Sequence, residues 1–234
     1  MGDARRRRRL IRLVEDLSAQ PTGSIPLASG GWAETKAAYR LLDNPALEWR
    51  ELLEVHTRRT AERMQGQAVV LCIQDTSELD FTTQPGIAGL GRLSYEAQHG
   101  LYGHPTLVVT PAGLALGVVA AWIWARAPKG VAQVKESVRW LEGYGIVADL
   151  AERVPDTRLV YVAAREGDIR ALMDEAVRRD QPADWLGRAN HNRNTTAGEK
   201  LWERLGRGEA LGEVEFMLPA APGRPARRVR QTLY

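Results

Sequence analysis

The chain has 234 residues, of which 44% are hydrophobic and 26% are charged, with a single cysteine and a formal net charge of +3. This composition is that of a soluble globular protein able to bury a core, and it excludes a disulfide framework and a thiolate metal site. The sequence has no run of 18 apolar residues and no apolar signal core, so we expect no membrane span and a cytoplasmic location.

The N-terminal residues have the pattern of a small all-helical module. Residues 3–18 carry apolar side chains at the spacing of one buried helical stripe: Leu10, Leu13, Val14 and Leu17. A breaker-rich loop separates this helix from a second one predicted over 33–42, and a third is predicted over 47–64. We therefore place a helical domain at residues 1–66.

Positive charge is concentrated near the two ends of the chain. Residues 5–9 are five consecutive arginines, and Arg12 follows on the same predicted helix. A second cluster consists of Arg224, Arg227, Arg228 and Arg230. Blocks of one sign attract polyanions even when the total charge is modest. A solvated helix face and a frayed tail are the alternative interpretations, which the pattern leaves open.

From Ala68 onward, short apolar strands alternate with helices. Strands are predicted at 68–74, 105–110, 114–124, 158–163, 184–189, 213–218 and 226–234, and helices at 131–144, 166–179 and 197–206. Three strands followed by helix, strand, helix and strand is the order of the ribonuclease-H-like fold, an α/β fold with a mixed sheet flanked by helices. In that fold the first and fourth strands are neighbours. We therefore expect the ends of 68–75 and 158–164 to lie side by side.

The segment between the first two main strands is rich in glycine. It contains Gly86, Gly89, Gly91, Gly100 and Gly103. Their spacing is not that of a phosphate-binding loop, and we expect a long flexible connection over the sheet. His99 and His104 lie in the same segment with no cysteine or glutamate at zinc spacing, which argues against a zinc site.

Asp75 is the first candidate for metal chemistry. It ends an apolar strand and is followed by Thr76 and Ser77. A carboxylate at a sheet edge suits Mg²⁺, which takes one or two carboxylates together with water and phosphate, and two such ions can catalyse phosphoryl transfer. The alternative is that Asp75 caps the following turn. Glu78 and Asp80 are expected to be surface residues.

Two further polar segments follow later strands. Asp168 is predicted in the first turn of a helix, where its charge favours the helix dipole. A shift in register would instead make it a metal ligand. The run 188–194 contains Arg188, His191 and Arg193 at a strand end and suits contacts with phosphates or bases, although a plain polar loop is equally consistent with it. Trp122 and Trp124 are expected to pack.

Several segments of the chain, in order, resemble bacterial insertion-sequence transposases of the DDE cut-and-paste type, relatives of retroviral integrase. The segments that carry the resemblance are 2–7 (GDARRR) with Leu10 to Leu17, 37–44 (AAYRLLDN), 73–79 (IQDTSEL), 136–140 (ESVRW), 165–169 (REGDI) and 188–191 (RANH). They span nearly the whole chain.

The resemblance implies a site of three carboxylates that binds Mg²⁺ or Mn²⁺. The first catalytic aspartate of the family falls on Asp75, but the second falls on Ala164, whose methyl group offers no lone pair. The catalytic glutamate of the family lies on a later helix, beyond an inserted β-rich domain. The resemblance therefore implies a core at 67–194 and an incomplete insertion at 195–234. It also implies a truncated chain with weak or no metal binding.

The resemblance further implies that the helical domain binds double-stranded DNA at transposon ends, through Arg5, Arg6, Arg9 and Arg12. Arg188, His191 and Arg193 are additional candidates for DNA contacts, and the full-length family suggests a homodimer. We expect a transposase that does not cleave DNA by itself. The alternatives are a DNA-binding remnant or inhibitor of a full-length transposase, and another ribonuclease-H-like nuclease that uses Asp75 and Asp168.

Overall fold

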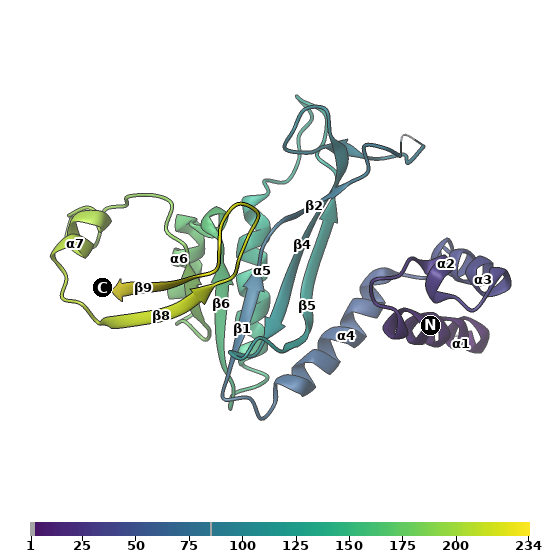
Figure 1. Cartoon of the computed structure of the whole chain (residues 1–234), viewed down its shortest axis with the longest axis horizontal. Helices are drawn as coiled ribbons and strands as arrows, with labels where there is room; N and C mark the ends of the chain where they lie inside the picture. Colours follow the sequence, from purple (N-terminus) through teal and green to yellow (C-terminus); the bar gives the residue numbers. More distant parts are fainter. Residues whose placement is uncertain (1–2, 85) are drawn as a thin grey trace.

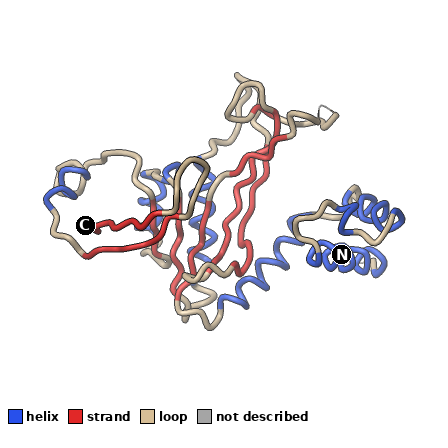
Figure 2. Tube along the Cα trace, viewed as in Figure 1, coloured by secondary structure: helices blue, strands red, loops and turns tan. Residues whose placement is uncertain are grey.

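The computed structural model describes residues 3–84 and 86–234 and has a mixed sheet with flanking helices, preceded by a helical segment (Figures 1 and 2). The predicted α/β fold class is therefore confirmed. Gly2, the first residue of the segment GDARRR, lies outside the described residues.

The N-terminal helices form a group set apart from the sheet, as Figure 1 shows. They are α1 (Ala4–Ala19), α2 (Ile25–Ala28) and α3 (Trp32–Leu42). Their small core consists of Leu13, Ala38 and Leu41. Val14 was expected in the buried stripe but is 55% exposed, because the contact with α3 covers only the face of α1 that carries Leu13.

Helix α4 (Trp49–Met64) leads from this group to the sheet and packs against strand β5 (Ala115–Trp124). Its last residue, Met64, is fully buried in the main core. Three α4 side chains bond to the backbone of β5. Arg63 donates from Nε to the Leu116 carbonyl at 2.6 Å, Thr57 donates to the Val119 carbonyl at 3.3 Å, and His56 Nε2 accepts from the Val118 N–H at 3.0 Å. The α4 side chains thus satisfy backbone hydrogen-bonding groups of β5. The domain limits of 1–66, 67–194 and 195–234 stay predictions.

Five strands of the main sheet follow one another in the order β5-β4-β1-β6-β7. Besides β5, they are β1 (Val69–Gln74), β4 (His99–Val109), β6 (Arg158–Ala163) and β7 (Asp184–Gly187). β4 is antiparallel to β1 and β5, whereas β1, β6 and β7 are parallel. The expected contact between the first and fourth main strands, β1 and β6, is confirmed.

The glycine-rich segment is more ordered than expected. Gly91 lies in the short strand β3 (Gly91–Arg92), and Gly100 and Gly103 lie within β4, which begins at His99 rather than at 105. β4 pairs there with β2 (Ser77–Asp80). A Cβ atom at Gly100 would lie 2.0 Å from the Leu79 carbonyl oxygen, so the glycine permits this close pairing. The expectation of a long flexible connection was therefore wrong for this part.

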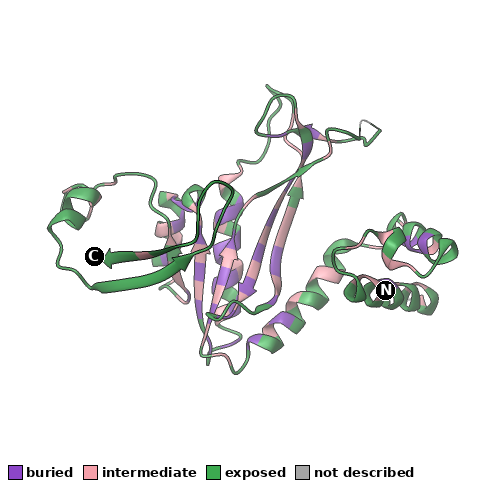
Figure 3. Cartoon of the chain, in the orientation of Figure 1, coloured by how far each residue is buried: buried purple, intermediate pink, exposed green. Residues whose placement is uncertain are grey.

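Helices α5 (Ser137–Ala151) and α6 (Arg170–Arg178) pack against each other on one face of the sheet, and a 3₁₀ turn, η1 (Arg165–Gly167), lies between β6 and α6. The helix predicted over 131–144 was misplaced, because Val131 and Val134 are exposed and the buried stripe continues through Tyr144 and Val147. Buried and half-buried residues alternate along the strands, which is visible as purple and pink bands in Figure 3.

The C-terminal part begins with α7 (Leu201–Arg207), which starts later than expected. The strands predicted at 213–218 and 226–234 are present as an antiparallel hairpin of β8 (Gly212–Leu218) and β9 (Arg227–Leu233). Both strands are largely exposed. Whether this hairpin belongs to an inserted domain stays a prediction.

Candidate functional site

Three parallel strands end at one edge of the main sheet. Gln74 pairs with Ala163, and Ala163 pairs with Gly187, at the carboxyl ends of β1, β6 and β7. The next residues along these strands are Asp75, Ala164 and Arg188. The Arg188 N–H donates to the Ala163 carbonyl at 3.2 Å, which holds the third strand end beside the second. The predicted site residues of three strands therefore meet at this edge.

Asp75 supplies a single carboxylate there. Its side chain is exposed and accepts a hydrogen bond from the Thr76 N–H at 2.9 Å, as expected for the turn-capping alternative. Ala164 lies at the start of the 3₁₀ turn and has no ligand atom in its side chain. Among residues 3–84 and 86–234, no group of three His, Cys, Asp or Glu side chains is arranged to hold a metal ion. Glu78 and Asp80 are exposed, as predicted.

The His104 side chain lies next to Thr76, the residue that follows Asp75. Its Nδ1 is 2.8 Å from Thr76 Oγ1, and its ring meets the Trp140 ring edge-on with centroids 4.7 Å apart. Burial, with a smaller effect of nearby Arg139, lowers the pKa of His104 to about 4. The ring is therefore neutral at physiological pH, and it belongs to the packing of the core rather than to an exposed ligand set.

A cluster of arginines and aromatic rings next to His104 could not be identified from the sequence. The Arg139 guanidinium lies 3.8 Å from the centre of the Trp124 ring, which in turn stacks on Tyr102. Arg126 lies over the other ring, Tyr102, and makes a two-point ion pair with Glu136 at 2.7 and 2.9 Å. The expected packing role of Trp124 is confirmed. Among the charged residues of this cluster, Glu136 and Arg139 were marked in the sequence only by the segment ESVRW.

Asp168 is buried and fully engaged by a neighbouring loop. Its Oδ2 accepts from the backbone N–H groups of Asn190 at 2.7 Å and His191 at 2.8 Å, and its Oδ1 accepts from Arg193 Nε at 3.0 Å. Burial acts to raise the pKa of Asp168, but these hydrogen bonds and the Arg193 charge together lower it below its ordinary value. The residue precedes α6 rather than lying in its first turn, so that expectation was wrong. Its two oxygens face the loop and not Asp75.

The N-terminal arginines line surface hollows on the helical group. Arg5, Arg6 and Arg9 border a polar hollow of 490 Å³ together with Asp3 and Asn44. Arg5 and Arg9 are exposed, and Arg6 lies 3.5 Å from the Asp3 carboxylate.

The hollow is therefore lined by three guanidinium groups and one carboxylate, which suits an anion. Arg12 lies further along α1, where it pairs with Asp16 at 3.0 Å.

The second arginine cluster is different, because part of its charge is neutralised within the hairpin. Arg228 and Arg230 contact the two oxygens of Glu215 at 3.0 and 3.2 Å, and Arg230 also approaches Glu213. Cross-strand ion pairs of this kind are a normal feature of an exposed hairpin. This cluster therefore offers less free positive charge than the one on α1.

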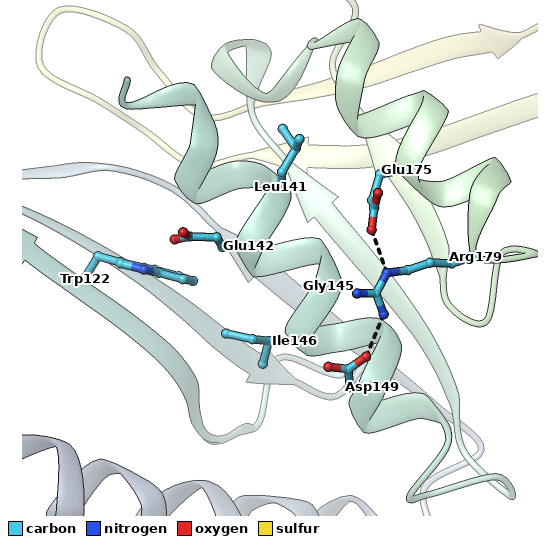
Figure 4. Close-up of a pocket in the computed structure, with 8 residues that line it drawn as sticks. All are labelled: Trp122, Leu141, Glu142, Gly145, Ile146, Asp149, Glu175 and Arg179. Atoms are coloured by element: carbon cyan, nitrogen blue, oxygen red, sulfur yellow. Dashed lines mark hydrogen bonds and ion pairs between the residues drawn. The ribbon is translucent and has the colours of Figure 1, made fainter. Parts of the chain in front are cut away.

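A further hollow lies beside α5 and α6. It measures 630 Å³ and is lined by Trp122 from β5 and by residues of α5 and α6 (Figure 4). Arg179 crosses it and joins Asp149 at 2.6 Å to Glu175 at 2.7 Å. These ion pairs engage Asp149 and Glu175 and join α5 to the end of α6, so the hollow has the character of a helix–helix seam.

Residues 1–47 match the family model described as transposase DNA-binding. The match covers α1, α2 and α3 and includes the arginines of α1. It supports a DNA-binding role in transposition for this part of the chain. No helix in the described ranges is long and apolar enough to cross a membrane.

Proposed function

We propose that this chain is a DNA-binding protein of the transposase type, which recognises transposon ends through α1. The observation that carries the proposal is the match of residues 1–47 to a transposase DNA-binding model, at the place where five consecutive arginines lie on one helix. Guanidinium groups recognise phosphates and base edges, and phosphate contacts provide most of the affinity for double-stranded DNA.

The geometry of α1 supports direct contact with a DNA backbone. Arg5 and Arg9 are one helical turn apart and border the same hollow as Arg6. Asp3 caps the helix by accepting from the Arg5 N–H at 2.8 Å, which fixes the first turn that carries these side chains. A rigid helix can therefore present three cationic groups to a phosphate backbone with little loss of conformational freedom.

We further propose that the body of the chain is the ribonuclease-H-like core of a DDE transposase and that it does not cleave DNA. The strand order β5-β4-β1-β6-β7 and the meeting of Asp75 with Ala164 support this relationship. The donor set does not fit a divalent metal, because Ala164 has no oxygen in its side chain and no three His, Cys, Asp or Glu side chains of residues 3–84 and 86–234 are grouped to hold one. Mg²⁺ or Mn²⁺ would bind weakly at best.

Two other functions are compatible with the same fold. A binding protein that occupies transposon ends without cutting them would inhibit a complete transposase, and the combination of the arginine helix with Ala164 favours this variant of the proposal. A nuclease that uses Asp75 and Asp168 is less favoured, because both oxygens of Asp168 already accept hydrogen bonds from the loop at 190–193.

The test is DNA affinity, measured by fluorescence anisotropy with duplex DNA over a range of salt concentrations in EDTA. We expect affinity to fall steeply with salt, and Arg6→Glu with Arg9→Glu to weaken binding about a hundredfold and flatten the salt dependence. A matched control reverses two exposed arginines on other helices, Arg59→Glu with Arg178→Glu. Equal binding by the α1 variant and the wild type would overturn the proposal.

A further inference from the structure

The loop that follows β7 is held in place by one carboxylate. Arg188 begins this loop, and Arg193 ends the segment that contacts Asp168. The Asp168 carboxylate accepts from two consecutive backbone N–H groups of the loop and also binds the Arg193 guanidinium, which lies 2.9 Å from it. Arg193 also donates to the Asp168 carbonyl. Four contacts on one residue therefore set the path of the loop.

These contacts compensate the negative charge of the Asp168 carboxylate. Its side chain is only 3% exposed, and the paired Arg193 side chain is 28% exposed. Hydrogen bonds to an ionised group are stronger than those between neutral groups, and a buried carboxylate needs such partners to stay ionised. Asp168 is thus a buried anchor, and the loop rather than the carboxylate faces outward.

The anchored loop begins at the same sheet edge as Asp75 and carries an arginine there that is unpaired within the described residues. Arg188 is exposed, is held beside Ala163 by its backbone N–H, and makes no ion pair within 3–84 and 86–234. His191 uses its backbone for the Asp168 contact, which leaves its exposed ring free to meet a ligand. Asn192 accepts from the Trp202 N–H at 3.0 Å, which fixes the far side of the loop to α7.

The missing carboxylate changes the electrostatics of this edge. An aspartate at position 164 would place a further negative charge between Asp75 and Arg188, whereas the alanine adds none. Phosphate groups are therefore repelled less strongly at this edge, and Arg188 can approach one without a metal ion to neutralise the carboxylates.

We propose that Asp168 is a positioning residue that fixes Arg188 and His191 as a metal-independent contact surface for the phosphate backbone of double-stranded DNA. This inference rests on the proposed DNA-binding function and adds a second contact region to it. It assigns Asp168 a role through the loop and not through a bound metal ion.

The test compares full-length Asp168→Asn with the wild type in EDTA. We expect backbone hydrogen exchange across 188–193 to become about tenfold faster, because a neutral amide is a weaker acceptor for the N–H groups of Asn190 and His191. DNA affinity should fall about threefold to tenfold, and the slope of log affinity against log salt should become shallower by about one. Asp174→Asn is the matched control, since Asp174 is exposed on α6 and pairs only with Arg170 among the described residues.

A second variant keeps the inference testable if Asp168→Asn does not fold. Arg188→Gln leaves every Asp168 contact in place, and it should reduce the salt slope by about one without changing hydrogen exchange at 190 and 191. The inference is overturned if Arg188→Gln binds DNA as the wild type does while the Arg6 and Arg9 variant binds weakly. It is also overturned if Asp168→Asn accelerates exchange and leaves affinity unchanged. Failure of the wild type to bind DNA would instead overturn the proposed function itself.

Discussion

Asp75 and Ala164 are the first residues beyond the last pair of the parallel strands β1 and β6, Gln74 with Ala163, and of the two only Asp75 carries a ligand oxygen. We predict that Ala164→Asp creates a divalent cation site, because two carboxylates from adjacent strand ends can then share one ion. Isothermal titration with Mn²⁺ should show binding about tenfold tighter than in the wild type. The gain should disappear in the double variant with Asp75→Ala. Unchanged Mn²⁺ affinity in Ala164→Asp would show that the two positions do not face one ligand.

The approach of α4 to the sheet depends on Gly117. This residue has a positive φ of 146°, and a Cβ atom there would lie 2.2 Å from Thr60 Oγ1. We predict that Gly117→Ala lowers the free energy of unfolding by about 2–4 kcal/mol, because it combines backbone strain with displacement of α4. Urea denaturation measures this change.

Gly113 is the matched control for that substitution. It also has a positive φ, of 86°, but a Cβ atom added there would have no neighbouring atom within 4 Å. Gly113→Ala should therefore cost only about 1 kcal/mol, the strain of the backbone alone. Equal losses in the two variants would remove the packing argument for α4.

Hydrophobic periodicity was enough to predict most of the fold. The strand at 158–163 and the hairpin strands near 213–218 and 226–234 were located closely, since each is a short run bounded by turn residues. Periodicity failed to predict the structure where a glycine allows two strands to pack closely. Gly100 and Gly103 signal a loop in a sequence, yet both lie in β4, where Gly100 allows the close approach of the neighbouring strand β2. The helix at 137–151 was also displaced, because Val131 and Val134 extend the apolar pattern without being buried.

His104 should make the stability of the chain depend on pH. Its pKa in the folded protein is about 4, compared with an ordinary value of 6.5, because burial disfavours the charged ring. The folded state therefore has full stability above pH 6.5, and this stability is lost progressively as the pH falls toward 4. The difference of roughly 2.5 pKa units corresponds to about 3 kcal/mol.

Urea denaturation at pH 7 and pH 4.5 measures this effect. His104→Gln should lose less stability between the two pH values than the wild type does. His99→Gln is the control, because His99 is exposed at the start of β4. A wild-type slope preserved in His104→Gln would assign the pH dependence to other groups, of which His56 is one, since burial also lowers its pKa.

The two arginine clusters should differ in their effect on DNA. Arg228 and Arg230 share Glu215, so much of their charge is already compensated within the hairpin. We predict that Arg228→Gln with Arg230→Gln changes DNA affinity by no more than about twofold. Anisotropy titrations in the same buffer as for the α1 variants provide the measurement, and a loss as large as that of the Arg6 and Arg9 variant would contradict the prediction.

The candidate site was only partly predictable from the sequence. Asp75 and Ala164 could be placed near each other, because the first and fourth strands of the expected fold are neighbours. Arg188 could be placed only at a strand end. The role of Asp168 could not be predicted, because its partners at 190, 191 and 193 are more than twenty residues away and two of the contacts are to backbone N–H groups. No sequence pattern specifies which carboxylate a loop backbone will contact.

We propose that this chain binds DNA but lacks the metal chemistry to cut it. Supercoiled plasmid incubated with saturating protein and Mg²⁺ or Mn²⁺ tests both parts, when binding is followed by gel shift and nicking by agarose electrophoresis of the same samples. We expect the plasmid to be shifted and its strands to stay intact, in the wild type and in Asp75→Ala alike. Efficient nicking by the wild type that is lost in Asp75→Ala would contradict the proposal.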